Sequence, residues 1–282
     1  MTITGKEDII GYIRIRKRGN NMRKAVFFDI DGTLWNKKCE ILPSTVKAIR
    51  KLRENGHLAF LCSGRSRANI RKKELLDIGF DGVVASCGTH IDFHKEIVFE
   101  VLLTEEQVAH LIAVAKEHRM PLVLEGPQYI YVNDGDFADD PYVIFLREEL
   151  GENVKVIPEN PAEICINKFS AETENFDLEK FAQDLGAEFQ MVVHTGDKVF
   201  EVIPTGHSKA TGIQKVCELL DIAREDTYAF GDSANDLEML AYVAHGIAMG
   251  NSDKEALAVA DYITTGVEED GIANGLKYYG LI

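Results

Sequence analysis

Short segments that are apolar throughout alternate with helix-like segments at both ends of this chain of 282 residues. Continuously apolar strands of this length are typical of parallel sheets that are buried on both faces, with helices as the crossover connections. The predicted strands of this kind are 25–30, 58–62, 82–86, 199–203, 227–230, 246–249 and 262–264. The pattern therefore predicts an α/β fold with a doubly wound, mainly parallel sheet.

Residues 88–197 have a different pattern, in which short alternating segments and helix signals follow one another without the apolar runs. A hairpin is predicted around His94 and Lys95, and a capping box from Thr104 to Gln107 predicts a helix start. We interpret this stretch as an α+β domain, 88–197, inserted into a core made of 23–87 and 198–282. Residues 1–22, which carry a basic run, are interpreted as a disordered extension, with a basic binding arm as the alternative.

Composition excludes several classes of function. The formal net charge of −15 lacks the basic footprint expected of a protein that binds nucleic acid or an anionic membrane. No segment approaches the ~20 apolar residues of a membrane span. The five cysteines are scattered, without a CxxC pair, and indicate neither a disulfide framework nor a zinc site. We expect a cytoplasmic protein with no obligate protein partner and a small-molecule ligand.

Polar residues follow the predicted strands in four places. Since ligands bind outside the carboxyl ends of the strands in a doubly wound sheet, these positions are the candidate site. The four groups are Asp29-Ile30-Asp31-Gly32-Thr33, Ser63-Gly64-Arg65, Lys209, and Gly231-Asp232-Ser233-Ala234-Asn235-Asp236. Each group alone has a local explanation, as a turn, a helix cap or a solvated side chain. Their joint occurrence, each after a buried strand, predicts one site.

This combination of motifs resembles the haloacid dehalogenase (HAD) superfamily, and more narrowly its Cof-type phosphohydrolases, over residues 23–282. In these proteins an α/β cap of type IIB lies between the second and third motifs. The resemblance implies a Mg²⁺-dependent phosphatase that hydrolyses a small organic phosphate monoester, such as a sugar phosphate or a phosphorylated cofactor, through an aspartyl-phosphate. The partner implied is a small phosphorylated metabolite.

The resemblance also assigns the reacting groups. Asp29 is the nucleophile, since a carboxylate can divide a slow hydrolysis into two easier steps. Mg²⁺ is placed on the Asp29 carboxylate, the Asp31 backbone carbonyl and Asp232, because hard cations prefer oxygen ligands. Asp31 donates a proton to the leaving oxygen and then accepts one from water.

Further residues are expected to hold the phosphoryl group. By resemblance, Lys209 and Ser63 contact its oxygens. Gly64, Arg65 and Asn235 are candidate phosphate- or substrate-binding residues, with a solvent-facing side chain as the alternative for Arg65. Asp236 is expected to orient Lys209 and the waters of the metal, or else only to cap the helix that follows. With Mg²⁺ and Lys209 at +3, the charge of about −3 on Asp29, Asp232 and Asp236 is neutralised.

Two other functions remain open at this point. A phosphomutase shares the first motif and a similar cap, and a receiver-like phospho-switch also gathers aspartates and a lysine on a doubly wound sheet. His90 and Lys168 are candidate substrate-selecting residues of the cap, with local hydrogen bonding as the alternative. The loop Ser86-Cys87-Gly88-Thr89 departs from the family pattern, in which an asparagine often precedes the glycine.

Overall fold

The computed structural model describes residues 23–133, 135, 139–172, 176–193 and 199–282. The predicted extension 1–22 lies outside these residues, as does His194, the last residue of a strand that the sequence pattern predicts over 189–194. The described chain divides into two compact units. The first, called the core unit here, comprises 23–63, 72–100 and 208–282, and the second, called the cap unit, comprises 64–71 and the described residues of 101–207.

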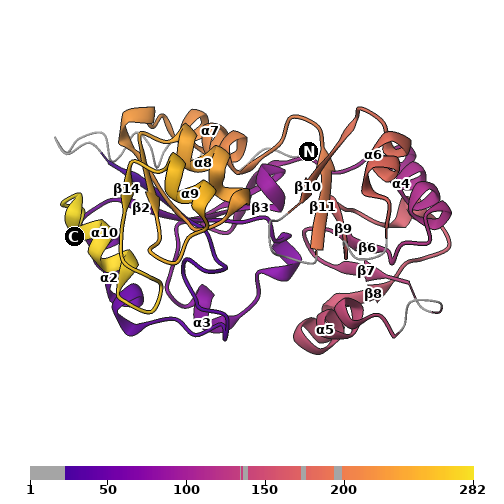
Figure 1. Cartoon of the computed structure of the whole chain (residues 1–282), viewed down its shortest axis with the longest axis horizontal. Helices are drawn as coiled ribbons and strands as arrows, with labels where there is room; N and C mark the ends of the chain where they lie inside the picture. Colours follow the sequence, from indigo (N-terminus) through magenta and orange to yellow (C-terminus); the bar gives the residue numbers. More distant parts are fainter. Residues whose placement is uncertain (1–22, 134, 136–138, 173–175, 194–198) are drawn as a thin grey trace. The chain divides into compact units, whose positions relative to one another are not determined.

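The core unit contains one eight-stranded sheet with the order β14-β13-β12-β1-β2-β3-β4-β5. Figure 1 labels β14, β2 and β3 of this sheet. The strands are β1 (Ala25–Phe28), β2 (Leu58–Cys62), β3 (Gly82–Ala85), β4 (His90–Phe93), β5 (Glu96–Glu100), β12 (Thr227–Gly231), β13 (His245–Ala248) and β14 (Tyr262–Ile263). All neighbours from β14 to β3 pair in parallel, whereas β4 and β5 pair antiparallel. The prediction of a mainly parallel α/β sheet is confirmed.

Helices cover both faces of this sheet. Neighbouring strand residues point in opposite directions, so strands that are apolar throughout present an apolar surface on each face. Phe27 packs in one cluster with Ile213 and Met239 of the helices on one face. Phe28 stacks on Phe230, with ring centroids 5.2 Å apart. A Cβ atom at Gly275, in the helix on that second face, would lie 2.5 Å from the Phe230 ring. The helices are α2 (Pro43–Glu54), α3 (Lys73–Leu76), α7 (Lys209–Leu220), α8 (Leu237–Tyr242), α9 (Lys254–Val259) and α10 (Gly271–Tyr278).

The cap unit has a six-stranded sheet with the order β10-β11-β9-β6-β7-β8. Its strands are β6 (Val123–Glu125), β7 (Ile130–Val132), β8 (Val154–Val156), β9 (Lys168–Glu172), β10 (Phe189–Val193) and β11 (Val199–Pro204), and its helices are α4 (Glu105–Glu117), α5 (Pro141–Leu150) and α6 (Leu178–Leu185). The capping box predicted at Thr104 and Gln107 begins α4. An apolar cluster that includes Leu111, Phe169 and Phe181 forms the interior of this α+β unit.

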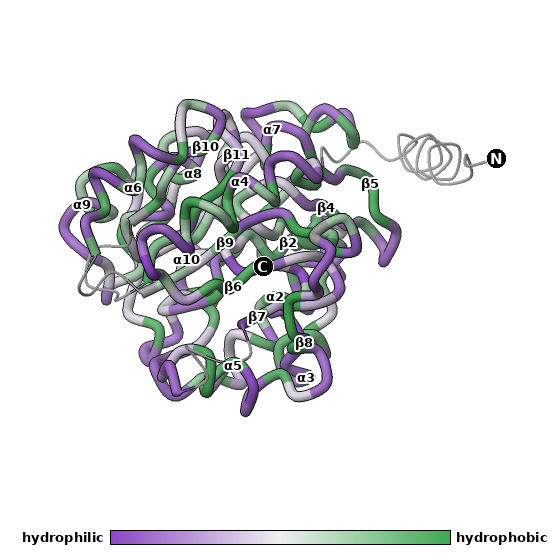
Figure 2. The backbone as a smooth tube through the Cα atoms, turned by 90° about the vertical axis from the view of Figure 1, so that its right-hand side faces the viewer, coloured by the Kyte–Doolittle hydropathy of each residue, from purple (hydrophilic) through white to green (hydrophobic). Residues whose placement is uncertain are grey.

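The observed units correct the predicted boundaries of the inserted domain. The hairpin β4–β5, predicted inside 88–197, pairs with β3 and forms one edge of the core sheet. Figure 2 shows the hydrophobic middle of β5 at this edge, where Ile97 is 57% exposed. Conversely, β11 was predicted in the core but pairs with β9 and β10 in the cap sheet. These pairings join segments that are distant in sequence, so local patterns do not specify them.

The sequence pattern of residues 67–78 favours a single helix, but this segment contains only a 3₁₀ turn at Arg67–Asn69 and the short α3. The segment 64–71 belongs to the cap unit. It is held there by hydrogen bonds from the Ala68 N–H to the Gly126 carbonyl and from Arg71 to the Gln128 carbonyl. These contacts compete with a continuous helix. Within the described part of the chain, no helix combines the length and the apolarity that a membrane crossing requires.

Candidate active site

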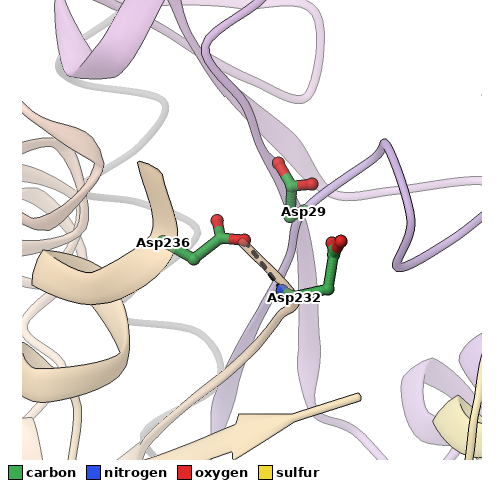
Figure 3. Close-up of side chains that lie close together, drawn as sticks. All are labelled: Asp29, Asp232 and Asp236. Atoms are coloured by element: carbon green, nitrogen blue, oxygen red, sulfur yellow. Dashed lines mark hydrogen bonds between the residues drawn. The ribbon is translucent and has the colours of Figure 1, made fainter. Parts of the chain in front are cut away.

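Asp29 and Asp232 lie side by side at the carboxyl edge of the core sheet. Asp29 directly follows β1 and Asp232 directly follows β12, and these two strands are parallel neighbours. Asp236 is one turn further along the chain and points toward the same place (Figure 3). One oxygen from each of the three carboxylates lies within 4.8 Å of the others. Asp29, which is distant in sequence from Asp232 and Asp236, therefore forms one acidic cluster with them.

Lys209 contacts this cluster from the first turn of α7. Its Nζ donates to Asp29 Oδ1 at 2.7 Å, to Asp236 Oδ1 at 2.6 Å and to Asn235 Oδ1 at 3.2 Å. The residue is 2% exposed, so each of these contacts is shielded from water. A capping box between Ser208 and the third helical residue begins α7 here, which sets where the lysine enters the site.

Asp236 supports two neighbours at once. Its Oδ2 accepts hydrogen bonds from the backbone N–H groups of Asp232 at 2.9 Å and Ser233 at 3.1 Å, and its Oδ1 accepts from Lys209 (Figure 3 marks the Asp232 bond). Asp236 therefore caps the turn that follows Ser233 and also contacts the lysine. A Cβ atom on Gly231 would lie 2.6 Å from Asp236 Cγ, so this approach needs a glycine.

The turn after β1 positions Asp232 through two residues that the sequence analysis did not assign. Thr33 Oγ1 donates to Asp232 Oδ1 at 2.8 Å. Gly32 has a φ of +77°, and a Cβ atom there would lie 2.2 Å from Asp232 Oδ2. The side-chain amide of Asn251 donates to the Gly32 carbonyl at 2.9 Å and holds the turn. The Asp-Gly-Thr motif indicates that Gly32 and Thr33 belong to the candidate site, but their contacts with Asp232 can be identified only in the folded structure.

The remaining predicted residues divide between the two units. Asp31 belongs to the core unit and is exposed, and its Oδ1 accepts from Trp35 Nε1 at 2.9 Å. Ser63 is buried after β2, and its own N–H donates to the Val84 carbonyl. Gly64 and Arg65 belong to the cap unit, where Arg65 Nη1 lies 3.3 Å from Asn69 Oδ1. The Ser-Gly-Arg motif therefore crosses the boundary between the units.

The two cap candidates are held by local partners. His90, which lies in β4 of the core unit, is 1% exposed and places Nδ1 2.8 Å from Glu100 Oε1. Lys168 in β9 is 2% exposed and contacts Glu201 and, at 3.2 Å, Glu125 Oε1. It also donates to the Gly64 carbonyl at 3.0 Å. For Lys168 the structure thus provides the local hydrogen bonding that was the alternative to substrate selection.

The electrostatics of the cluster favour an added cation. Burial, followed by the charge of Asp236, raises the pKa of Asp29 well above its usual value, although Lys209 opposes the rise. Burial and Asp236 also raise the pKa of Asp232 to about 7. Burial lowers the pKa of Lys209, but the attraction of Asp236 and Asp29 outweighs it, so the net shift is upward. One ammonium therefore faces three mutually repelling carboxyl groups.

Hard oxygen donors of this kind suit a divalent cation such as Mg²⁺. Asp236 uses both oxygens as acceptors from N–H donors, which leaves it poorly placed to serve as a ligand. Asp29 and Asp232 each use one oxygen in the bonds described above, and each has a second oxygen. The donor set therefore fits a cation held between Asp29 and Asp232.

Comparison with known proteins decides the family. The family model for haloacid dehalogenase-like hydrolases matches residues 26–276. The chain is a haloacid dehalogenase-like hydrolase. A Bacillus subtilis relative named "Putative phosphatase YkrA" is 35% identical to this hydrolase over 266 residues, which cover 92% of this chain and 98% of the relative. The prediction of a Cof-type HAD enzyme that hydrolyses phosphoric monoesters is confirmed at this level.

Two further relatives carry more specific names. The 5-amino-6-(5-phospho-D-ribitylamino)uracil phosphatase YitU of Bacillus subtilis is 28% identical over 274 residues, covering 90% of this hydrolase and 96% of YitU. The solved structure of BT4131, described as a sugar phosphatase of HAD subclass IIB, superposes with a TM-score of 0.79 at 25% identity. That match covers 92% of this chain and all of the solved one.

Proposed function

We propose that this HAD hydrolase cleaves a small organic phosphate monoester, with the Asp29 carboxylate as the nucleophile. The observation that carries the proposal is the contact of the buried Asp29 carboxylate with Lys209 Nζ at 2.7 Å, at the carboxyl edge of the sheet. A carboxylate held beside a fixed cation can meet an anionic phosphate with less repulsion than it would in water.

In the first step, Asp29 attacks phosphorus and the bond from phosphorus to the leaving oxygen breaks. Asp31 is two residues away and exposed, and it delivers a proton to that oxygen. In the second step, water attacks the phosphoryl group on Asp29, Asp31 takes the proton of the water, and the Asp29 carboxylate is released. Phosphate and the alcohol are the products.

Lys209, held by its partners, offsets the negative charge of the phosphoryl group. The ammonium is fixed by Asp236 and Asn235, so it keeps its position while the phosphoryl group moves. Ser63, buried after the neighbouring strand β2, is proposed to donate its hydroxyl to a phosphoryl oxygen. Gly64 and Arg65 are proposed as further phosphate-binding residues, through the backbone and the guanidinium group.

The Asp29 and Asp232 carboxylates, with the Asp31 backbone carbonyl, are proposed to hold Mg²⁺. A bound divalent cation supplies positive charge beside the phosphoryl oxygens and balances the acidic cluster. The raised pKa of Asp232, about 7, supports this proposal, because burial and the charge of Asp236 disfavour the ionised carboxyl group and a bound cation would offset both effects. Asp236 would then orient the surroundings through its three hydrogen bonds.

The substrate is proposed to be a sugar phosphate or a phosphorylated cofactor or cofactor precursor. Two similar proteins are named as a sugar phosphatase and as a phosphatase of a phosphoribityl-aminouracil. The substrates in both names carry their phosphate on a polyhydroxylated carbon chain. We therefore expect a polyol or sugar portion in the substrate.

A phosphate-release screen over sugar phosphates, nucleotides, and flavin and pyridoxal phosphates, with Mg²⁺ present, tests the proposal. Wild-type protein is expected to release phosphate from part of this panel. Asp29→Asn should fold and release almost none, whereas the control Asp77→Asn, an exposed residue paired with Lys73, should match wild type. Near-normal release by Asp29→Asn would refute the nucleophile. Transfer of the phosphoryl group to a second sugar would instead indicate a phosphomutase.

A further inference from the structure

Trp35, the single tryptophan of the chain, makes a hydrogen bond to a group that the proposed reaction uses. Its Nε1 donates to Asp31 Oδ1 at 2.9 Å. The tryptophan is 3% exposed, whereas Asp31 is exposed. A buried indole therefore holds one oxygen of a solvent-facing carboxyl group that lies two residues after the proposed nucleophile.

The turn that carries both residues is closed by its own backbone. The N–H of Trp35 donates to the Ile30 carbonyl at 3.3 Å, and the Gly32 N–H donates to the Trp35 carbonyl at 3.1 Å. The ammonium of Lys72 lies 5.6 Å from the centre of the indole ring and adds a cation–π contact. Because the ring is buried and its backbone is bonded on both sides, the direction of its N–H is set by the fold.

The chemistry of the indole assigns the two oxygens of Asp31. An indole N–H is a donor only, so Oδ1 must act as an acceptor whether Asp31 is protonated or ionised. A carbonyl or carboxylate oxygen is a better acceptor than a protonated carboxyl oxygen, so the indole N–H favours Oδ1 as the unprotonated oxygen. The proton that Asp31 exchanges is therefore favoured on Oδ2.

We propose that Trp35 is a positioning residue, which orients Asp31 so that Oδ2 faces the leaving oxygen of the substrate; this inference rests on the proposed acid–base role of Asp31. As the bond between phosphorus and the leaving oxygen breaks and the Asp29–phosphorus bond forms, the Oδ2 proton passes to the leaving oxygen. Water later returns a proton to Oδ2 while its oxygen displaces Asp29 from phosphorus. Replacing the indole removes the N–H that directs Oδ1, and with it the contact that sets this orientation.

Leaving groups that differ in basicity test the proposal. An alkyl phosphate from the active panel needs protonation of its leaving oxygen, whereas para-nitrophenyl phosphate needs little. Release of the leaving group is measured in rapid-quench experiments with enzyme in excess, which isolate the first step. Trp35→Phe keeps an aromatic ring but removes the donor. It should slow release from the alkyl phosphate roughly 10-fold or more, since general acids contribute about 10²–10⁴-fold, and leave para-nitrophenyl phosphate near wild type.

The possible results separate the two proposals. No release by wild-type protein from either substrate would overturn the proposed function itself. If wild-type protein releases both leaving groups and Trp35→Phe slows both equally, or slows neither, the role of Trp35 alone would be overturned. Asp31→Asn should also slow release from the alkyl phosphate more than release from para-nitrophenyl phosphate. The double variant should be no slower than Asp31→Asn, because both substitutions affect the same proton transfer.

A spectroscopic measurement checks the hydrogen bond without changing Trp35. The chain has one tryptophan, so a ¹⁵N-labelled sample gives one indole N–H resonance. Asp31→Ala should move this resonance toward the position of a tryptophan that lacks a carboxylate acceptor. The exposed control Asp77→Asn should leave it in place. An unchanged resonance in Asp31→Ala would refute the inference even if Trp35→Phe failed to fold.

Discussion

Replacing Asp232 by asparagine should make the metal-free protein more stable at pH 8. The folded protein raises the pKa of this carboxyl group from 3.8 to about 7, through burial and the charge of Asp236. A raised carboxyl pKa means that the unfolded chain loses its proton first, so wild-type stability falls as the pH rises from about 4 to about 7. At 1.36 kcal/mol for each pKa unit, the loss reaches about 4 kcal/mol above pH 7.

Asparagine keeps the acceptor for Thr33 but carries no charge, so the variant avoids this loss. In urea unfolding with EDTA, Asp232→Asn should exceed wild type by up to about 4 kcal/mol at pH 8 and equal it near pH 4. Asp81→Asn is the matched control, because Asp81 is also buried but pairs with Arg53 at 2.8 Å. That change should destabilise by about 3 kcal/mol. A variant at Asp232 that is no more stable than wild type at pH 8 would refute the reasoning.

Mg²⁺ should reduce this difference in stability. A cation that binds only the folded state stabilises it, and binding needs the ionised Asp232. Wild-type protein should therefore gain stability with Mg²⁺ at pH 8, gain less as the pH falls below about 7, and show a larger gain than Asp232→Asn. An equal gain in the variant would mean that the cation binds elsewhere.

Two further substitutions test particular contacts. Gly32→Ala should reduce phosphate release at least about 10-fold, because a Cβ atom would lie 2.2 Å from Asp232 Oδ2; Gly56→Ala has a similar φ but no atom within 4 Å, and it should retain activity. Lys168→Met leaves two buried glutamates without their ammonium and should cost about 3–5 kcal/mol in urea unfolding. The exposed Lys180→Met should change little, and equal effects would contradict the account.

The strand pattern of the sequence predicts where the main acidic residues of the candidate site lie. Asp29 and Asp232 could be predicted as neighbours because each directly follows an apolar strand, and parallel strands end at one edge. Lys209 could be predicted from the family resemblance and from its place after the strand 199–203, although that strand pairs in the cap sheet. The roles of Gly32 and Trp35 could not, because they depend on a positive φ and on where a ring lies after the turn closes.

The boundaries of the inserted domain show a different limit of sequence reasoning. β11 and the hairpin β4–β5 have ordinary strand patterns, and only pairing with distant segments decides which sheet each joins. The same holds for 67–71, where the helix-like pattern of 67–78 gives way to hydrogen bonds with the cap backbone. Local propensity is a weak guide where such tertiary contacts compete.

Identification of the phosphorylated residue tests the central claim most directly. Protein that is turning over an active substrate is quenched in acid, and its peptides are mapped by mass spectrometry, with Asp31→Asn used to slow breakdown of the intermediate. We expect one phosphoryl group on the peptide that contains Asp29, and none in Asp29→Asn. Turnover with the phosphoryl group on any other residue, or with no labelled peptide in Asp31→Asn, would contradict the account.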